Sequence, residues 1–226
     1  ARRGARAVAR RVRRARACGV MHVPAGGRAW LGVAALLAAG ALAGWPVAHE
    51  AIDWQPGLAS TQPWRAFTAI GVHYSALHLA ANLAGTALVG CFGAVARVPR
   101  RCAWAWLAAW PLTQFGLLLK PELLHYGGLS GVLHAGVAIV GIYLLATGAR
   151  AQRGTGARAQ GALAAAVLVG LVAKLLSEAP WGDALRHPAG WDIAVAPLAH
   201  ATGALAGVIT GAIGAAIALR LPRRAA

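Results

Sequence analysis

The chain alternates between long apolar runs and short polar segments. An apolar run of about 20 residues is long enough to cross the hydrocarbon of a bilayer as a helix. Only helices and closed barrels satisfy their backbone hydrogen bonds there, so each run is expected to be a transmembrane helix. The predicted spans cover residues 29–48, 67–95, 102–119, 129–147, 161–177 and 197–219. The pattern therefore predicts an all-α, polytopic membrane protein with a six-helix bundle.

The composition agrees with a membrane protein, because 58% of the 226 residues are hydrophobic and only 12% are charged. We expect residues 28–220 to form the helical domain, 1–27 to be a basic segment without a stable fold, and 221–226 to be a basic tail. The first segment has no small-residue cleavage site after an apolar core, so it is not a cleaved signal peptide. It is either a basic arm on anionic lipid or translated leader upstream of Met21.

The formal net charge is +16, and its distribution predicts the topology. Basic residues cluster at the start, at 97–101, at 148–160 and at the tail, as expected for cytoplasmic segments. The acidic residues lie in or beside the alternate loops, namely Glu50, Asp53, Glu122, Glu178, Asp183 and Asp192. Both termini are therefore expected in the cytoplasm. Basic clusters that alternate with apolar runs favour lipid over nucleic acid as the partner.

The cysteines and histidines do not predict a metal or cofactor site. Cys18, Cys91 and Cys102 lack metal-ligand or pairing spacing, and we interpret them as free thiols. A site built from the histidines would lack a carboxylate or thiolate partner inside the membrane. We therefore expect no metal and no cofactor.

Six polar residues interrupt the apolar spans, and they are candidates for function. A polar group in a span costs a few kcal/mol on insertion scales, so it is seldom kept without a role. The predicted topology places all of them in the outer half of their spans. They are His73, His78, Asn82, Ser130, His134 and His200.

Ser130 lies between Gly128 and Gly131, where a loop becomes an apolar run. A serine at such a turn is either a helix N-cap or a nucleophile that needs a nearby base. His78 and Asn82 are four residues apart and share a helix face. They fit hydrogen-bond donors for an oxyanion, or polar contacts between helices.

His200 shares a helix face with Gly203 and Gly207, and such a stripe of small residues lets a neighbouring helix approach closely. If that neighbour is the fourth span, His200 meets Ser130. His134 lies one turn below Ser130 and would then support the His200 ring.

Three motifs, in order and on the expected helices, resemble those of the rhomboid intramembrane serine proteases. They are Trp64-Arg65-x-Phe67-Thr68 with His73-x-Ser75-x-x-His78-x-x-x-Asn82, then Gly128-Leu129-Ser130-Gly131, and Ala199-His200-x-x-Gly203-x-x-x-Gly207. The resemblance implies Ser130 as nucleophile, His200 as general base, and His78, Asn82 and the Ser130 N–H as oxyanion donors. His73, Gly128, Gly131, Gly203 and Gly207 would be supporting residues. No third carboxylate is expected, because the rhomboid pattern needs none and no acidic residue lies in a span centre.

Within this family the chain is most similar to the rhombosortases. The resemblance rests on the run from Gly128 to His134, with His134 where broader rhomboids have tyrosine, and on Lys174 with Glu178. It implies cleavage of exported proteins at a C-terminal tail with Gly-Gly, a hydrophobic helix and an Arg-rich end. The acyl group of the cleaved protein would be transferred to water or to an amine. The site would face the periplasm from the bacterial inner membrane. The alternatives are a non-catalytic rhomboid-like protein that binds transmembrane segments and, with less support, a transporter.

Overall fold

The computed structural model describes residues 24–150 and 155–220. The expectations for residues 1–23 and 221–226, and for the thiol of Cys18, lie outside these residues. Within them all regular structure is helical, apart from two isolated β-bridges. The all-α prediction is therefore confirmed.

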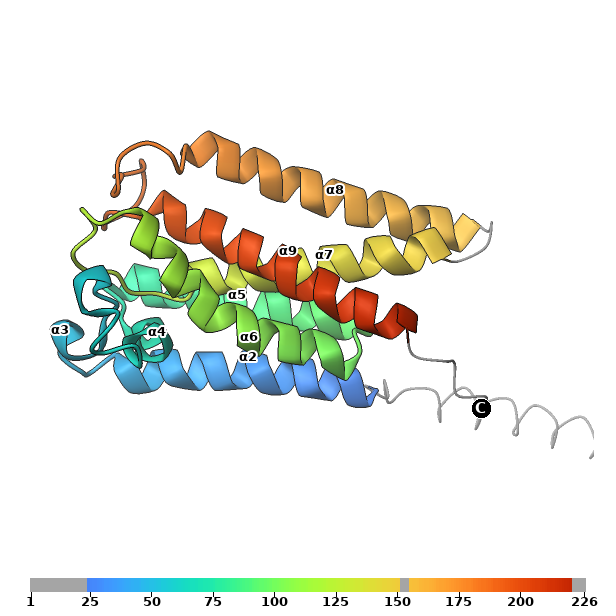
Figure 1. The fold of residues 1–226 in the computed structure, drawn as a ribbon, viewed down its shortest axis with the longest axis horizontal. Coiled ribbons are helices and arrows are strands. Elements are labelled where there is room, and N and C mark those ends of the chain that lie inside the picture. The colour runs from blue at the N-terminus through green and yellow to red at the C-terminus, as the bar shows by residue number, and fades with distance from the viewer. Residues whose placement is uncertain (1–23, 151–154, 221–226) are drawn as a thin grey trace, which may run out of the picture.

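Six of the described helices are long and apolar enough to cross a membrane. They run roughly along the long axis of the molecule (Figure 1). They are α2 (Ala25–Gly44), α5 (Ala76–Val95), α6 (Arg100–Phe115) with its 3-10 extension η3 (Gly116–Leu119), α7 (Ser130–Arg150), α8 (Thr155–Glu178) and α9 (Pro197–Arg220). The chain is thus a multi-pass membrane protein, as predicted.

Helix α7 packs against α5, α6, α8 and α9, and its most extensive contact is with α9. The core beside it contains stacked indole rings of Trp30 and Trp106, with centroids 4.3 Å apart. Each indole N–H donates to a backbone carbonyl, Trp106 to Val132 at 2.8 Å and Trp30 to Val89 at 2.9 Å. A buried polar group without a partner is costly, so these bonds let tryptophan occupy the core. The Trp106 bond also ties α6 to the first turn of α7, and the Trp30 bond ties α2 to α5.

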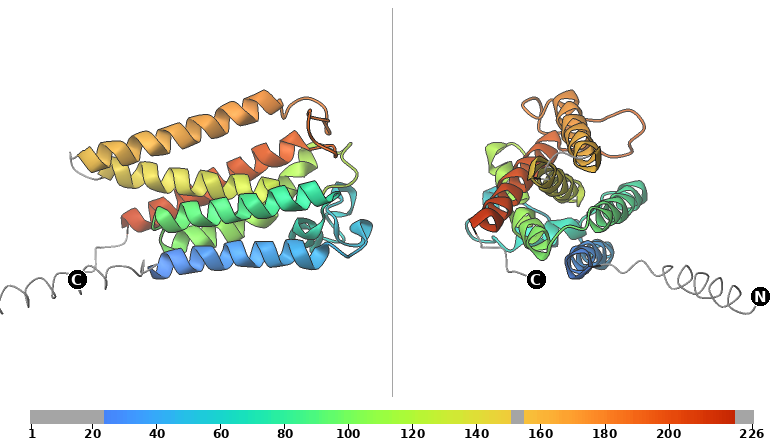
Figure 2. Two further views of the ribbon diagram at one scale, coloured as in Figure 1. Left: turned by 180° about the vertical axis from the view of Figure 1, so that it is seen from behind. Right: turned by 90° about the vertical axis from the view of Figure 1, so that its right-hand side faces the viewer.

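Helix α8 lies at the edge of the bundle, as the end-on view in Figure 2 shows. It packs mainly against α7, has few contacts with α9, and is the least buried of the candidate spans. Residues 179–196 then return the chain to the start of α9.

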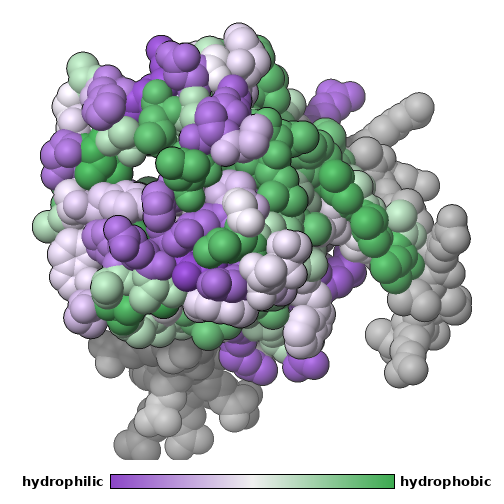
Figure 3. Space-filling view, turned by 60° about the vertical axis from the view of Figure 1, so that its left-hand side comes forward, coloured by the Kyte–Doolittle hydropathy of each residue, from purple (hydrophilic) through white to green (hydrophobic). Residues whose placement is uncertain are grey.

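One end of the bundle carries residues 45–75, 120–129 and 179–196, and we call it the loop end (Figure 1). It includes the short helices α3 (His49–Ile52), η1 (Pro56–Leu58), α4 (Arg65–Thr68) and η2 (Ala69–Gly71). Polar side chains gather at this end, whereas the flank of the bundle is largely apolar (Figure 3).

The loop before α7 is held by paired backbones and a buried charge. Trp54 and Tyr126 exchange two backbone hydrogen bonds of 2.8 and 2.9 Å. Beside them, the buried Asp53 carboxylate binds Arg65 at 3.1 Å and His125 at 2.6 Å. Buried charges are tolerated when they are paired and hydrogen-bonded. This network therefore fixes the segment that leads to Ser130.

The predicted second span, 67–95, is wrong in its first third. Residues 65–71 form α4 and η2, and the spanning helix α5 begins only at Ala76. Ser75 has an extended backbone, and its hydroxyl accepts a hydrogen bond of 3.0 Å from the His78 N–H. This N-cap starts a new helix inside a continuous apolar run. His73 therefore lies in a loop rather than in a span.

The first helix also differs from the prediction, because it starts at Ala25 and ends at Gly44. The start lies three residues before Arg28, the predicted first residue of the helical domain. Close packing explains both ends: a Cβ on Gly26 would overlap the backbone of the 97–99 turn, and one on Gly44 would overlap Gly71.

Candidate active site

Ser130 is the first residue of α7, and the backbone before it has an unusual conformation. Gly128 has φ +125°, a region that side-chain-bearing residues rarely adopt. A Cβ there would also lie 2.8 Å from His78 Nε2. Glycine is therefore required at this position.

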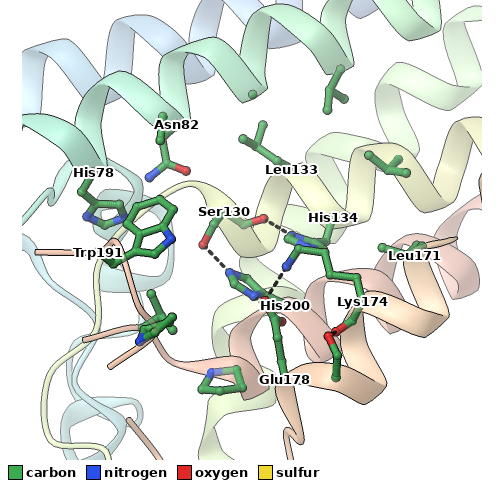
Figure 4. Close-up of a pocket in the computed structure, with 18 of the residues that line it drawn as sticks. His78, Asn82, Ser130, Leu133, His134, Leu171, Lys174, Glu178, Trp191 and His200 are labelled. Atoms are coloured by element: carbon green, nitrogen blue, oxygen red, sulfur yellow. Dashed lines mark hydrogen bonds and ion pairs between the residues drawn. The ribbon is translucent and has the colours of Figure 1, made fainter. Parts of the chain in front are cut away.

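Glycines bring α9 against α7. A Cβ on Gly203 would overlap the carbonyl of Gly131, and one on Gly207 would overlap Ala135. With the two backbones this close, His200 Nε2 lies 2.9 Å from Ser130 Oγ (Figure 4). This is hydrogen-bonding distance for a nucleophile and its base.

His134 lies beside this pair. Its ring stacks on that of His200, with centroids 4.3 Å apart and an interplanar angle of 16°. Its Nδ1 is 2.6 Å from the Ser130 carbonyl oxygen. Since a carbonyl only accepts, Nδ1 carries the proton and donates. His134 thereby ties the position of the His200 ring to the first turn of α7.

The structure also brings a carboxylate to His200, contrary to expectation. Glu178 Oε2 lies 2.7 Å from His200 Nδ1, and Glu178 Oε1 lies 2.5 Å from Lys174 Nζ (Figure 4). Glu178 ends α8 and His200 lies in the first turn of α9, so residues 179–196 return the chain to the same depth. A carboxylate at a span end can thus reach the imidazole without lying in a span centre.

His78 and Asn82 project from one face of α5 toward the start of α7 (Figure 4). The Tyr74 N–H points at His78 Nδ1 at 3.4 Å, so the proton of the His78 ring belongs on Nε2. Asn82 Nδ2 is buried and has no hydrogen-bond partner within residues 24–150 and 155–220. A Cβ on Gly128 would lie 2.8 Å from the first nitrogen and 3.6 Å from the second. Two donors therefore flank the segment that leads into Ser130, and one of them, Asn82 Nδ2, has no acceptor among the described residues.

A family model described as "Rhomboid domain" matches residues 60–217. The chain belongs to the rhomboid family. Rhomboids are intramembrane serine proteases, and the match includes both Ser130 and His200. No curated protein and no solved structure matches this rhomboid chain.

A cavity of about 740 Å³ opens beside Ser130 in this rhomboid protein. Its walls come from α5, α7, α8, α9 and the 179–196 loop, and most of its lining side chains are apolar, among them Leu88, Val137, Leu171 and Trp191. The Ser75 hydroxyl donates to Asp192 at 2.8 Å and so fastens the loop to the start of α5. The cavity can hold an apolar chain segment next to the serine.

His73 lies behind the site rather than in the cavity. It is buried, and its ring centroid is 4.8 Å from that of His78. Burial lowers the pKa of His73, partly offset by a hydrogen bond to Gly71 and reinforced by His49. A neutral His73 fits a packing role behind His78.

Among residues 24–150 and 155–220 there is no group of three or more His, Cys, Asp or Glu side chains that could hold a metal ion. Cys91 and Cys102 are free thiols, as interpreted from the sequence.

The sequence pointed to Glu178 through the resemblance, but it did not reveal the contact of Glu178 with His200. Its pairing with Lys174 is visible as an i, i+4 spacing, but its proximity to His200 depends on how a long loop closes. One sequence feature could have indicated this contact: Glu178 lies at the end of the span that precedes the span of His200.

Proposed function

We propose that this rhomboid protein is an active intramembrane serine protease that uses Ser130 and His200. The observation that carries the proposal is the 2.9 Å distance between Ser130 Oγ and His200 Nε2. The hydroxyl donates its proton to Nε2 while Oγ attacks the scissile carbonyl carbon. The imidazolium then gives that proton to the leaving amine, and an acyl-enzyme remains on Ser130.

The developing oxyanion would bind to His78 Nε2–H, Asn82 Nδ2–H and the backbone N–H of Ser130. The first N–H groups of a helix have no partner within it, so the Ser130 N–H is available. Losing one such donor typically lowers the rate by about 10²–10³-fold.

The substrates we propose are exported proteins with a rhombosortase-type C-terminal tail: Gly-Gly, a hydrophobic helix and an Arg-rich end. The apolar cavity beside Ser130 suits an apolar tail segment, and small glycine residues suit the close approach to the nucleophile. His134 beside the serine supports the rhombosortase assignment. Water or an amine would release the acyl group.

The same proposal includes a location in the bacterial inner membrane with the loop end facing the periplasm. Support comes from the basic clusters at the opposite ends of the helices, such as Arg97, Arg100 and Arg101 beside the start of α6. Tails of exported proteins would then reach Ser130 from the periplasmic side.

Co-expression with a reporter protein that carries such a tail tests the activity. We expect Ser130→Ala and His200→Ala to insert normally and to abolish processing, and Ser60→Ala, an exposed serine in the loop after η1, to process at the parental rate. Mass spectrometry of the new C-terminus would identify both the cut site and the acceptor.

A fluorophosphonate probe distinguishes a protease from a non-catalytic protein that binds transmembrane segments. A protease is labelled on Ser130, and the label is lost in Ser130→Ala. Processing by Ser130→Ala at the parental rate would contradict the proposed nucleophile.

A further inference from the structure

Four side chains from three helices form one continuous chain of hydrogen bonds at the site (Figure 4). Lys174 Nζ binds Glu178 Oε1 at 2.5 Å, and Glu178 Oε2 binds His200 Nδ1 at 2.7 Å. His200 Nε2 in turn lies 2.9 Å from Ser130 Oγ. Each carboxylate oxygen and each ring nitrogen thus has one partner.

We propose that Glu178 completes a Ser–His–Glu triad as the positioning residue for His200, and that Lys174 holds Glu178 in place. The inference rests on the proposed protease function and adds a carboxylate to its serine and histidine. Glu178 does not touch the reacting atoms, since its partners are His200 and Lys174.

The first reason is the tautomer of His200. An ionised carboxylate only accepts hydrogen bonds, so its partner Nδ1 must carry the ring proton. Nε2 then presents its lone pair to the Ser130 hydroxyl, as a general base must. A neutral imidazole without this partner has two tautomers, and one of them points an N–H at Ser130 instead.

The second reason is charge. When Ser130 attacks, His200 becomes an imidazolium in a site with little water, where fixed charges act more strongly than in bulk solvent. Glu178 lies directly against that positive charge. Lys174 balances Glu178 in the resting state, which makes a carboxylate at the span end tolerable.

The alternative to a positioning role is that Glu178 only holds α8 in place. Helices α8 and α9 share few contacts, so the Glu178–His200 bond could be only a strut between them. Arg186 also donates to the Glu178 carbonyl at 2.7 Å, and this bond does not involve the carboxylate. As a strut, the side chain of residue 178 can either donate to His200 Nδ1 or accept from it. To set the tautomer of His200, the side chain must accept.

Glu178→Gln separates these two roles. The amide keeps the size and can still bond to His200. Lys174 Nζ only donates and so takes the amide oxygen, which leaves the NH₂ to donate to Nδ1 and favour the wrong tautomer. We expect kcat to fall by roughly 10²–10⁴-fold with little change in KM, as for the corresponding Asp-to-Asn change in a serine protease triad. Glu178→Asp should restore part of kcat, and Lys174→Gln should lower it less than Glu178→Gln. Glu122→Gln, at an exposed carboxylate in another loop, is the matched control.

The tautomer can be read directly from the ¹⁵N NMR shifts of the His200 ring, measured in the Ser130→Ala background so that turnover plays no part. We expect the Nδ1–H form with Glu178 and the Nε2–H form with Glu178→Gln. If Glu178→Gln does not insert, the protein with Glu178 decides alone, because an Nε2–H majority there overturns the proposal.

The activities of Ser130→Ala and Glu178→Gln distinguish an error in the triad from an error in the protease assignment. If Ser130→Ala is inactive while Glu178→Gln keeps the parental kcat and the Nδ1–H tautomer, Glu178 is a strut and the triad is wrong. If Ser130→Ala is fully active, the protease assignment itself is wrong.

Discussion

At the scale of single residues, His134 supports His200 through two separate contacts. The ring stacks on His200, and Nδ1 donates to the Ser130 carbonyl. We expect His134→Tyr to retain part of the activity, because an aromatic ring remains, and His134→Ala to lose more. The measurement is kcat on the tail reporter, with insertion checked by recovery in the carbonate-washed membrane fraction. A complete loss in a well-inserted His134→Tyr would give His134 a chemical role instead of a packing role.

His73 makes the stability of the protein depend on pH. Its pKa in the folded protein lies below the ordinary value of 6.5, chiefly because of burial. The unfolded chain therefore binds more protons than the folded chain as pH falls below about 6.5, and stability falls with it. We expect His73→Gln to show a smaller drop in thermal midpoint between pH 7.5 and pH 5, in detergent, than the parental protein. Equal drops in both proteins would show that His73 does not contribute.

The site residues differ in how visible they were in the sequence. Ser130, His200, His78 and Asn82 stood out because polar groups inside apolar runs are rare. Glu178 stands at a span end, where charged residues are ordinary. Its role depends on a distance set by the 179–196 loop, and composition and periodicity do not encode that distance.

At the scale of elements, the contact of α9 with α7 is made by backbones rather than by large side chains. We expect Gly203→Val to push α9 away from Gly131 and to lower kcat/KM by about 10²-fold, as misplacing a reacting group by about 1 Å can do. Gly32→Val on α2 is the control, because a Cβ there meets no atom within 4 Å. Parental activity in Gly203→Val would show that the close approach is not needed.

The glycine stripe was readable from its four-residue spacing, and so was the existence of each span. The start of α5 could not be predicted from the sequence, because the N-cap at Ser75 interrupts a run that stays apolar on both sides. Hydropathy sets the length of a run but cannot show where one helix ends and the next begins.

At the scale of the whole molecule, the alternation of basic and acidic loops predicts the orientation. In a background with Cys18→Ala and Cys91→Ala, we expect Asp183→Cys at the loop end to react with an impermeant maleimide in intact cells. Arg100→Cys at the other end should react only after the membrane is permeabilised. The reverse pattern would place the loop end in the cytoplasm and contradict the proposed substrates.

The order of the helices around α7 could not be predicted from the sequence. The spans are apolar on all sides, so their faces do not indicate which neighbour they bury. The peripheral position of α8 follows from packing that only the structure shows.

The amide of Asn82 is expected to affect kcat and thermal stability in opposite directions. Asn82 Nδ2 has no acceptor among the described residues, and a buried donor without a partner costs about 1–3 kcal/mol. We expect Asn82→Leu to raise the thermal midpoint while lowering kcat, measured on the same purified samples. A variant that is both less stable and less active would argue against this. Under the proposed mechanism, folding stability and oxyanion binding therefore place opposite demands on position 82.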